Sequence, residues 1–214
     1  MRKRILLISI LIPFYGLAQF GIRAGYNYAN VTNASSINNS SRSGFLAGII
    51  IAPQSKKIVS YTTELTYSKQ GYDFANDTNT GNVNLDYIIS SHLLCINITK
   101  FFSIQLGGQV AYLINAKADS TSKTNSMAGP YSSALNYYNQ FDYGFAGGVE
   151  VHPVLGLLIG ARYNISLAKL YKSAYTTTPG QAPSFASIDA RNNVVQLYAG
   201  WRFGKNKSDK DKKK

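Results

Sequence analysis

The sequence predicts an all-β chain that closes into an eight-stranded antiparallel up-and-down transmembrane β-barrel. Three observations support this prediction: strand-like segments with one apolar and one polar face, connections that alternate between short and long, and an export-like N-terminus. Successive side chains of a strand point to opposite faces, so strict alternation indicates a ribbon with two different sides. Short turns alternating with longer loops are typical of bacterial outer-membrane barrels.

The N-terminal segment has the features of a secretory signal peptide. Arg2, Lys3 and Arg4 precede an apolar core at residues 5–12, and the small residues Gly16 and Ala18 predict cleavage between Ala18 and Gln19. We therefore expect a signal peptide at 1–18, a barrel domain at 19–204 and a lysine-rich periplasmic tail at 205–214.

Eight segments show a period of two and are expected as strands. They cover residues 20–30, 43–52, 58–71, 83–98, 103–117, 139–152, 156–172 and 192–203. The short connections are 53–57, 99–102 and 153–155, and the long ones are 31–42, 72–82, 118–138 and 173–191. An even number of strands predicts that both termini are periplasmic, with the long connections outside the cell.

The two faces of the last strand are the most distinct. One face carries Val195, Leu197, Ala199, Trp201 and Phe203, and the other carries Gln196, Tyr198, Gly200 and Arg202. A soluble ligand-carrying barrel is the alternative, but it would scatter lysine and glutamate along its polar faces. Here the lysines lie in turns, loops and strand ends. We therefore expect the apolar faces to contact lipid. The segment 83–98 is the least clear, because Asp86, Ser90, Ser91 and His92 interrupt both of its faces.

Aromatic residues also indicate a membrane. Tyrosine favours the headgroup level of a bilayer and forms girdles there. Among the 16 tyrosines, those expected near an interface are Tyr26, Tyr28, Tyr67, Tyr72, Tyr112 and Tyr171. Trp201 and Phe203 are expected at the periplasmic rim.

The positive charge of the chain does not indicate a nucleic-acid partner. Of the net +12, three charges lie in the signal and four in the tail, which carries six lysines and two aspartates. A lysine-rich end without interleaved aromatics is usually a solvated tail, with weak attraction to anionic lipid headgroups as the alternative. The expected partners are outer-membrane lipid, the outer-membrane assembly machinery and an extracellular or envelope protein.

Five ionisable residues fall on the inward faces of the predicted strands. They are Arg23, Glu64, Glu150, Arg162 and Arg202. A narrow lumen should pair them, because an unpaired buried charge is costly. We expect an ionic network that fills and locks the barrel; a gate or a small-anion site is the alternative.

Five stretches resemble the PorT-like family of outer-membrane β-barrels in Gram-negative bacteria. They are 20–28 (FGIRAGYNY), 64–71 (ELTYSKQG), 145–150 (FAGGVE), 160–164 (GARYN) and 194–203 (VVQLYAGWRF). The resemblance implies the same architecture and an outer-membrane location. The chain departs from the family at its end, where eleven residues follow Phe203. The family's named member is associated with protein secretion, so an accessory role in secretion is implied only by analogy.

Candidate catalytic residues are few. The single cysteine, Cys95, allows no internal disulfide, and no cluster has the spacing of a metal or cofactor site. His152 is predicted at a periplasmic turn, and a base at His92 would need a partner from another strand, such as Asp142. We therefore expect no enzymatic activity.

The loops are the expected functional surface, because binding residues concentrate on loops carried by a rigid scaffold. The candidates for partner contact are Tyr131, Tyr137, Tyr138, Tyr175 and Phe185. The predicted role is structural, or the presentation of extracellular loops to a protein or glycan partner. A narrow channel for small solutes is the alternative.

Overall fold

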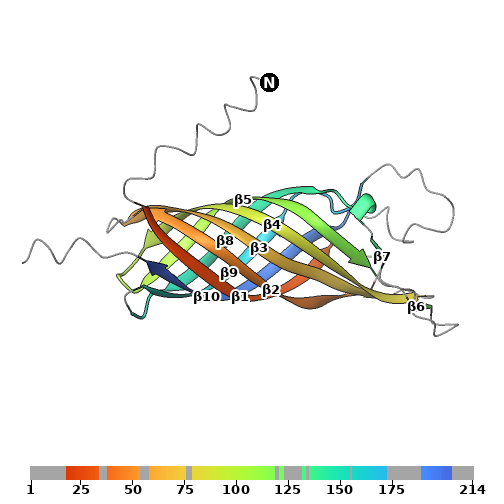
Figure 1. The fold of residues 1–214 in the computed structure, drawn as a ribbon, viewed down its shortest axis with the longest axis horizontal. Coiled ribbons are helices and arrows are strands. Elements are labelled where there is room, and N and C mark those ends of the chain that lie inside the picture. Colours follow the sequence, from red (N-terminus) through yellow and green to blue (C-terminus); the bar gives the residue numbers. More distant parts are fainter. Residues whose placement is uncertain are drawn as a thin grey trace, which may run out of the picture.

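Eight long strands form a closed barrel in the computed structural model of the chain (Figure 1). The strands are β1 (Ala18–Thr32), β2 (Asn38–Pro53), β3 (Val59–Ala75), β4 (Asn79–Asn97), β5 (Phe102–Ala118), β8 (Phe141–Val151), β9 (Leu157–Ser166) and β10 (Arg191–Phe203). The structure describes residues 18–33, 38–53, 58–75, 79–118, 121–122, 132–133, 135–154, 156–172 and 189–203.

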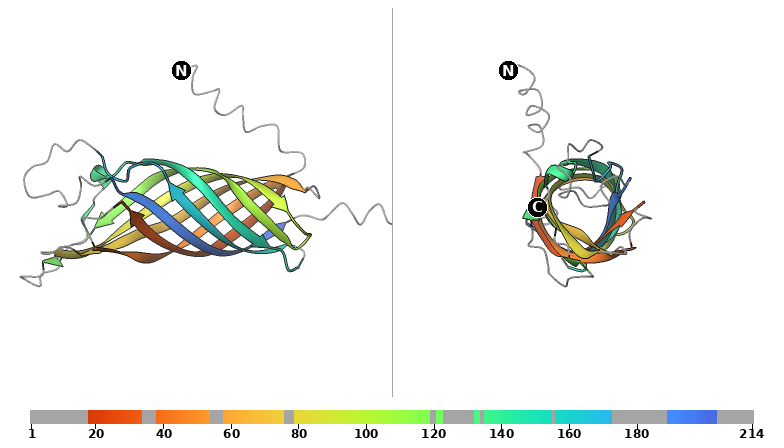
Figure 2. Two further views of the ribbon diagram at one scale, coloured as in Figure 1. Left: turned by 180° about the vertical axis from the view of Figure 1, so that it is seen from behind. Right: turned by 90° about the vertical axis from the view of Figure 1, so that its right-hand side faces the viewer.

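Each long strand pairs antiparallel with the next, and β1 pairs with β10 to close the ring (Figure 2). Three short elements follow β5: β6 (Thr121–Ser122), β7 (Ser132–Ser133) and the 3-10 turn η2 (Leu135–Tyr137). The start of β1 and the end of β10 lie at one end, with the turns that follow β2, β4 and β8. We call this the short-turn end and the opposite one the long-loop end. Within the described residues, no helix has the length and apolar character needed to cross a bilayer.

The strands are staggered around the barrel. A path of paired residues that starts at Phe20 passes once around and returns to β1 at Asn30, a displacement of ten residues. A stagger of this kind requires the strands to tilt against the barrel axis. An eight-stranded ring leaves an interior that side chains can fill, and this interior holds the buried residues of the chain.

The predicted eight-stranded antiparallel fold is confirmed, with two corrections to its elements. Segments 31–42 and 72–82 were expected as long loops, but β1 to β4 run through most of them and leave only 33–37 and 76–78 between strands. The seventh strand ends at Ser166 rather than Lys172. The fourth strand, expected at 83–98, is confirmed as one strand of 19 residues.

The fourth strand was difficult to assign because apolar side chains lie on both of its faces, while Asp86, Ser90 and His92 interrupt the outward one. Leu85 and Tyr87 point inward near the long-loop end, whereas Leu94 and Ile96 point outward near the short-turn end. Register shifts occur at the same height, between Asp86 and Tyr87 on β4 and in the long-loop half of β2. The long-loop third of the barrel is therefore built like a soluble core, with apolar side chains inside.

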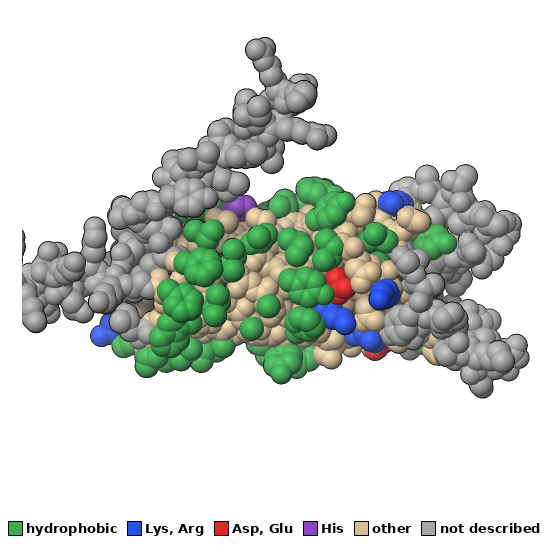
Figure 3. Space-filling model, in the orientation of Figure 1, with side chains coloured by type: hydrophobic (Ala, Val, Ile, Leu, Met, Phe, Trp, Pro, Cys, Tyr) green, Lys and Arg blue, Asp and Glu red, His purple; other side chains and the backbone are tan. Residues whose placement is uncertain are grey.

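The outer wall is apolar over most of its height. On the face shown in Figure 3, hydrophobic side chains are spread from the short-turn end past the middle of the barrel, and most charged side chains lie toward the long-loop end. Exposed aromatic residues mark the wall on several strands, among them Tyr26, Phe45, Tyr112, Phe141 and Tyr143. Such a surface is stable only in a hydrocarbon environment or against a partner.

Candidate functional site

The five ionisable residues predicted for the lumen lie in one connected cluster. Four of them are at most 3% exposed, and Arg202 is partly buried at the short-turn end. The Glu64 carboxylate accepts two hydrogen bonds from Arg162, at 2.5 Å from Nη1 and 3.0 Å from Nη2. Arg23 Nη1 lies 2.9 Å from the same carboxylate, so one acid from β3 bridges guanidinium groups of β1 and β9.

The second acid of the cluster is Glu150, which is fully buried on β8. Its Oε1 atom lies 2.7 Å from Arg202 Nη2 and 3.2 Å from His152 Nε2. His152 stands just beyond the end of β8, and burial lowers the pKa of its imidazole despite the attraction of Glu150. Three guanidinium groups facing two carboxylates leave the cluster with one excess positive charge.

Two residues that the sequence analysis did not select connect the two acids. Gln105 donates from Nε2 to Glu150 at 3.0 Å and accepts from Arg162 at 2.5 Å. The Tyr198 hydroxyl lies 3.2 Å from both Gln105 Oε1 and Glu150 Oε2, and the Arg23 and Arg162 guanidinium groups lie over its ring. The alternation of β10 places Tyr198 on the inward face, and this pattern could have identified it as a lumen residue. We call the five ionisable residues, together with Gln105 and Tyr198, the ionic network.

Glycine residues make room for the large side chains of this network. Arg23 is paired with Gly48 on one side and Gly200 on the other. Gly160 is paired with both Glu150 and Tyr198, and a Cβ atom at this position would collide with the Tyr198 ring. The network therefore depends on glycine in the neighbouring strands as well as on its own charges.

Uncharged polar side chains occupy the lumen above the ionic network. Asn27 donates to Ser68 Oγ at 2.9 Å and accepts from Gln196 at 3.2 Å. Gln70 donates to the same Ser68 hydroxyl and accepts a hydrogen bond from Asn192. These buried hydroxyl and amide groups continue the polar filling toward the long-loop end.

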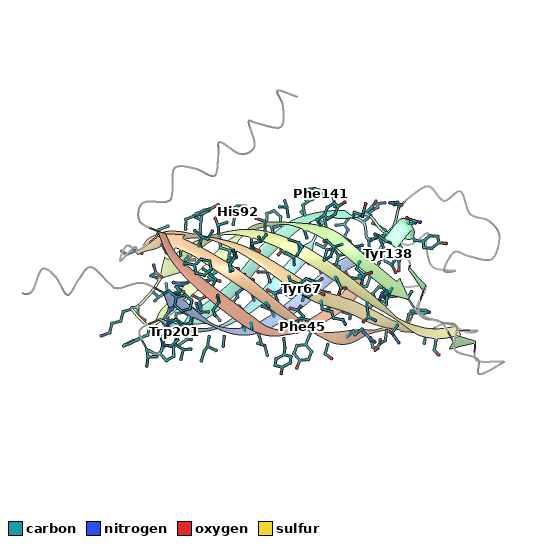
Figure 4. The ribbon with its side chains drawn as sticks, in the orientation of Figure 1. Phe45, Tyr67, His92, Tyr138, Phe141 and Trp201 are labelled. Atoms are coloured by element: carbon teal, nitrogen blue, oxygen red, sulfur yellow. The ribbon has the colours of Figure 1, made fainter. Side chains whose placement is uncertain are left out.

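A cluster of tyrosines and aliphatic residues closes the long-loop end. The Tyr72 hydroxyl lies 3.2 Å from that of Tyr138 and hydrogen-bonds to that of Tyr171. The rings of Tyr138 and Tyr171 are 5.1 Å apart, and Figure 4 shows Tyr138 near this end of the barrel. We call this cluster the tyrosine cap; its other buried members include Tyr87, Leu85, Leu113, Leu170 and Ala190.

The positions of the tyrosines in the cap differ from those expected from the sequence. Tyr138 was expected as an exposed loop aromatic, but its side chain is fully buried, and Tyr137 packs against the same cluster. Tyr72 and Tyr171 were expected at a membrane interface, but they point into the lumen. Loop aromatics resemble surface residues in the sequence because no periodicity reveals which way they fold. Tyr131, Tyr175 and Phe185 lie outside the described residues.

The remaining predicted residues lie apart from the lumen cluster. Trp201 and Phe203 are exposed at the short-turn end of β10, where Phe203 stacks on Phe20. Ala18 and Gln19 begin β1. In the described part of the chain, no group of three or more His, Cys, Asp or Glu side chains could hold a metal ion.

The residues considered for catalysis are arranged differently from expectation. Asp142 accepts a hydrogen bond from Ser166 and is not a partner of His92. His92 instead lies 2.7 Å from the Tyr61 hydroxyl and 3.3 Å from the Ser90 hydroxyl, on the outward face of β3 and β4. Ser90 and His92 are two residues apart, so they share a face.

Known proteins resemble the chain in sequence and in fold. The family described as "Outer membrane protein beta-barrel domain" matches residues 13–172. Ail, the attachment invasion locus protein of Yersinia pestis, is 16% identical with a TM-score of 0.50, over 87% of this chain and 99% of Ail.

Two further solved structures are similar. Neisserial surface protein A is 16% identical with a TM-score of 0.47, over 87% of this chain and 99% of its own. OprG from Pseudomonas aeruginosa is 13% identical with a TM-score of 0.43, over 88% of this chain and 97% of OprG. No curated protein sequence matches the chain significantly. At these identities the likeness concerns the fold alone.

Proposed function

The chain belongs to the family of the outer membrane protein beta-barrel domain, and from this premise we propose a non-enzymatic role in which it presents its extracellular loops to a protein or glycan partner. It is an outer-membrane β-barrel protein. In the proposed topology the short-turn end is periplasmic, residues 1–18 are removed after export, and 205–214 form a periplasmic tail. The quoted strand motifs support a PorT-like affiliation within the family.

The observation that carries this proposal is the filling of the lumen at two heights. The ionic network crosses the lumen near the periplasmic end through strands β1, β3, β5, β8, β9 and β10. The tyrosine cap fills the opposite end with side chains from the wall and from the segments after β7 and β9. A lumen filled in this way supports a rigid scaffold rather than a solute path.

The position of the Ser90–His92 pair supports a non-enzymatic role. A serine and a histidine in contact resemble a nucleophile with its base. Both face outward from the wall, and Figure 4 shows His92 between Trp201, at the periplasmic rim, and Phe141, nearer the long-loop end. Lipid esters and water lie at the bilayer interfaces, and this height is inside the hydrocarbon region.

Ion conductance in planar bilayers tests the closed lumen. The purified barrel should pass essentially no steady current, because charged and tyrosine side chains fill the path. Porin-like steady conductance at neutral pH would instead favour the narrow-channel alternative. An otherwise identical recording with a known porin establishes that inserted barrels are detected.

A pull-down from detergent-solubilised membranes tests the loop-presenting role. The bait is the full chain, compared with a variant that lacks residues 123–130 and with a matched variant that lacks residues 176–183. A partner should be retained by the full chain and lost with one of the two deletions. Equal recovery with all three folded baits would contradict loop presentation.

A further inference from the structure

The lipid-facing wall carries one cluster of hydrogen-bonding side chains on β3 and β4. It consists of Tyr61, Thr63, Ser90 and His92, which we call the β3–β4 polar patch. His92 is exposed, and its ring lies between the Tyr61 hydroxyl at 2.7 Å and the Ser90 hydroxyl at 3.3 Å. The Thr63 hydroxyl lies 3.4 Å from the same ring.

The patch lies at the height of the hydrocarbon. On β4, His92 is midway between the outward-facing apolar residues Ile88 and Ile96. On other strands the outward positions of this belt carry exposed apolar residues, such as Ile22 on β1, Ile159 on β9 and Leu197 on β10. Polar residues at this depth are costly toward lipid and mark functional surfaces in membrane proteins.

The wall beside the patch leaves room for a neighbouring molecule to approach closely. Gly108 on β5 is paired with His92, and a Cβ atom there would meet only the Gly144 carbonyl oxygen at 3.8 Å. The β5 position paired with His92 therefore carries no side chain. Small residues let two backbones approach closely within a membrane, which strengthens packing and hydrogen bonds.

We propose that the β3–β4 polar patch is the interface of a homodimer in the outer membrane. A hydrogen-bonding partner in hydrocarbon must present polar groups at the same depth. A second copy does so by symmetry, because a two-fold axis along the membrane normal places like residues at equal heights. Histidine, serine, threonine and tyrosine each donate and accept hydrogen bonds, so the patch is complementary to itself without charge repulsion.

Cysteine cross-linking in membranes tests this interface. In a Cys95→Ser background, Ser90→Cys should form a disulfide-linked product of twice the chain mass on oxidation. The matched control is Val195→Cys, which faces outward on β10, on the opposite side of the ring. The control should stay monomeric. Equal cross-linking at both positions, none at position 90, or a product with a different protein would overturn the proposal.

The association of the native chain provides a second measurement. Mass measurement of the barrel in nanodiscs should show dimers, and His92→Leu should weaken the dimer about tenfold, as expected for one or two lost hydrogen bonds in lipid. Leucine suits a lipid-facing position, so this variant should still fold and show the gel mobility of a folded barrel. An unchanged dimer fraction, or a monomeric native chain, would overturn the proposal.

Discussion

The two ends of the lumen are closed by different chemistry. The short-turn half holds the ionic network, whose side chains all come from the barrel strands and pair with one another at 2.5–3.2 Å. The long-loop end holds the tyrosine cap, which combines apolar side chains with hydrogen-bonded tyrosine hydroxyls and takes Tyr138 and Tyr171 from segments outside the long strands. The comparison indicates that the network fixes the barrel itself, whereas the cap fastens the loops to it.

The strongest test of this difference removes the central acid of the network. Glu64→Ala leaves the Arg23 and Arg162 guanidinium groups buried without their carboxylate, so we expect a loss of about 3–5 kcal/mol in the free energy of unfolding. Urea unfolding in detergent, followed by gel mobility, measures it. The control is Arg42→Ala, which breaks a partly exposed ion pair with Asp73 and should cost no more than about 1 kcal/mol. Equal losses would show that the network does not lock the barrel.

A smaller effect is expected when the network is overpacked. Gly160→Ala places a methyl group against the Tyr198 ring, and forced packing of this kind costs about 1–3 kcal/mol. Gly108→Ala adds the same group on the open outer wall and should leave stability nearly unchanged. The same unfolding assay compares them, and a Gly160→Ala barrel as stable as the wild type would contradict the described contact.

The tyrosine cap should respond locally rather than globally. Tyr72→Phe removes the hydroxyl that joins Tyr138 and Tyr171, at an expected cost of about 0.5–1.5 kcal/mol. We expect faster proteolysis within segments 135–140 and 167–172, with little change in barrel unfolding. Tyr112→Phe, on the outer wall, is the control. A variant that loses barrel stability without faster cleavage would remove the distinction between the two ends.

The smallest expected effect is a pH dependence at the periplasmic end. Burial lowers the pKa of His152, so the unfolded chain binds this proton more readily than the folded one. Stability from this group is therefore present above the unfolded histidine pKa of about 6.5 and is lost as pH falls through the lower folded value. Unfolding temperatures at about pH 7.5 and about pH 5.5 should differ less in His152→Gln than in the wild type. Identical slopes would contradict this.

The sequence predicted the short-turn half of the molecule more accurately than the long-loop half. In the membrane, the outside of most strands is apolar, so alternation alone separates Arg23, Glu64 and Arg162 from the lipid-facing residues. This rule located the eight strands and assigned the five ionisable residues to their inward faces. Gln105 and Tyr198 were visible on the same faces, but neither carries a charge that demands a partner.

The rule fails where the barrel leaves the hydrocarbon. There the outside faces water, so β4 turns apolar residues such as Leu85 inward and Asp86 outward, which reads as an interruption of both faces. Polar segments that continue a strand, such as 38–42, resemble loops for the same reason. Tyr138 was missed because its burial depends on contacts with Tyr72 and Tyr171, which are distant in sequence.

The seam between β1 and β10 has a consequence for how the barrel forms. Its pairs run from Phe20 with Phe203 to Thr32 with Arg191, so residues near opposite ends of the chain must meet before the ring is complete. Until the last strand arrives, β1 keeps an open edge that could pair with another chain. During biogenesis, β1 must therefore stay unpaired on this edge until β10 is in place. A product truncated before residue 191 would lack β10 and could not close the barrel.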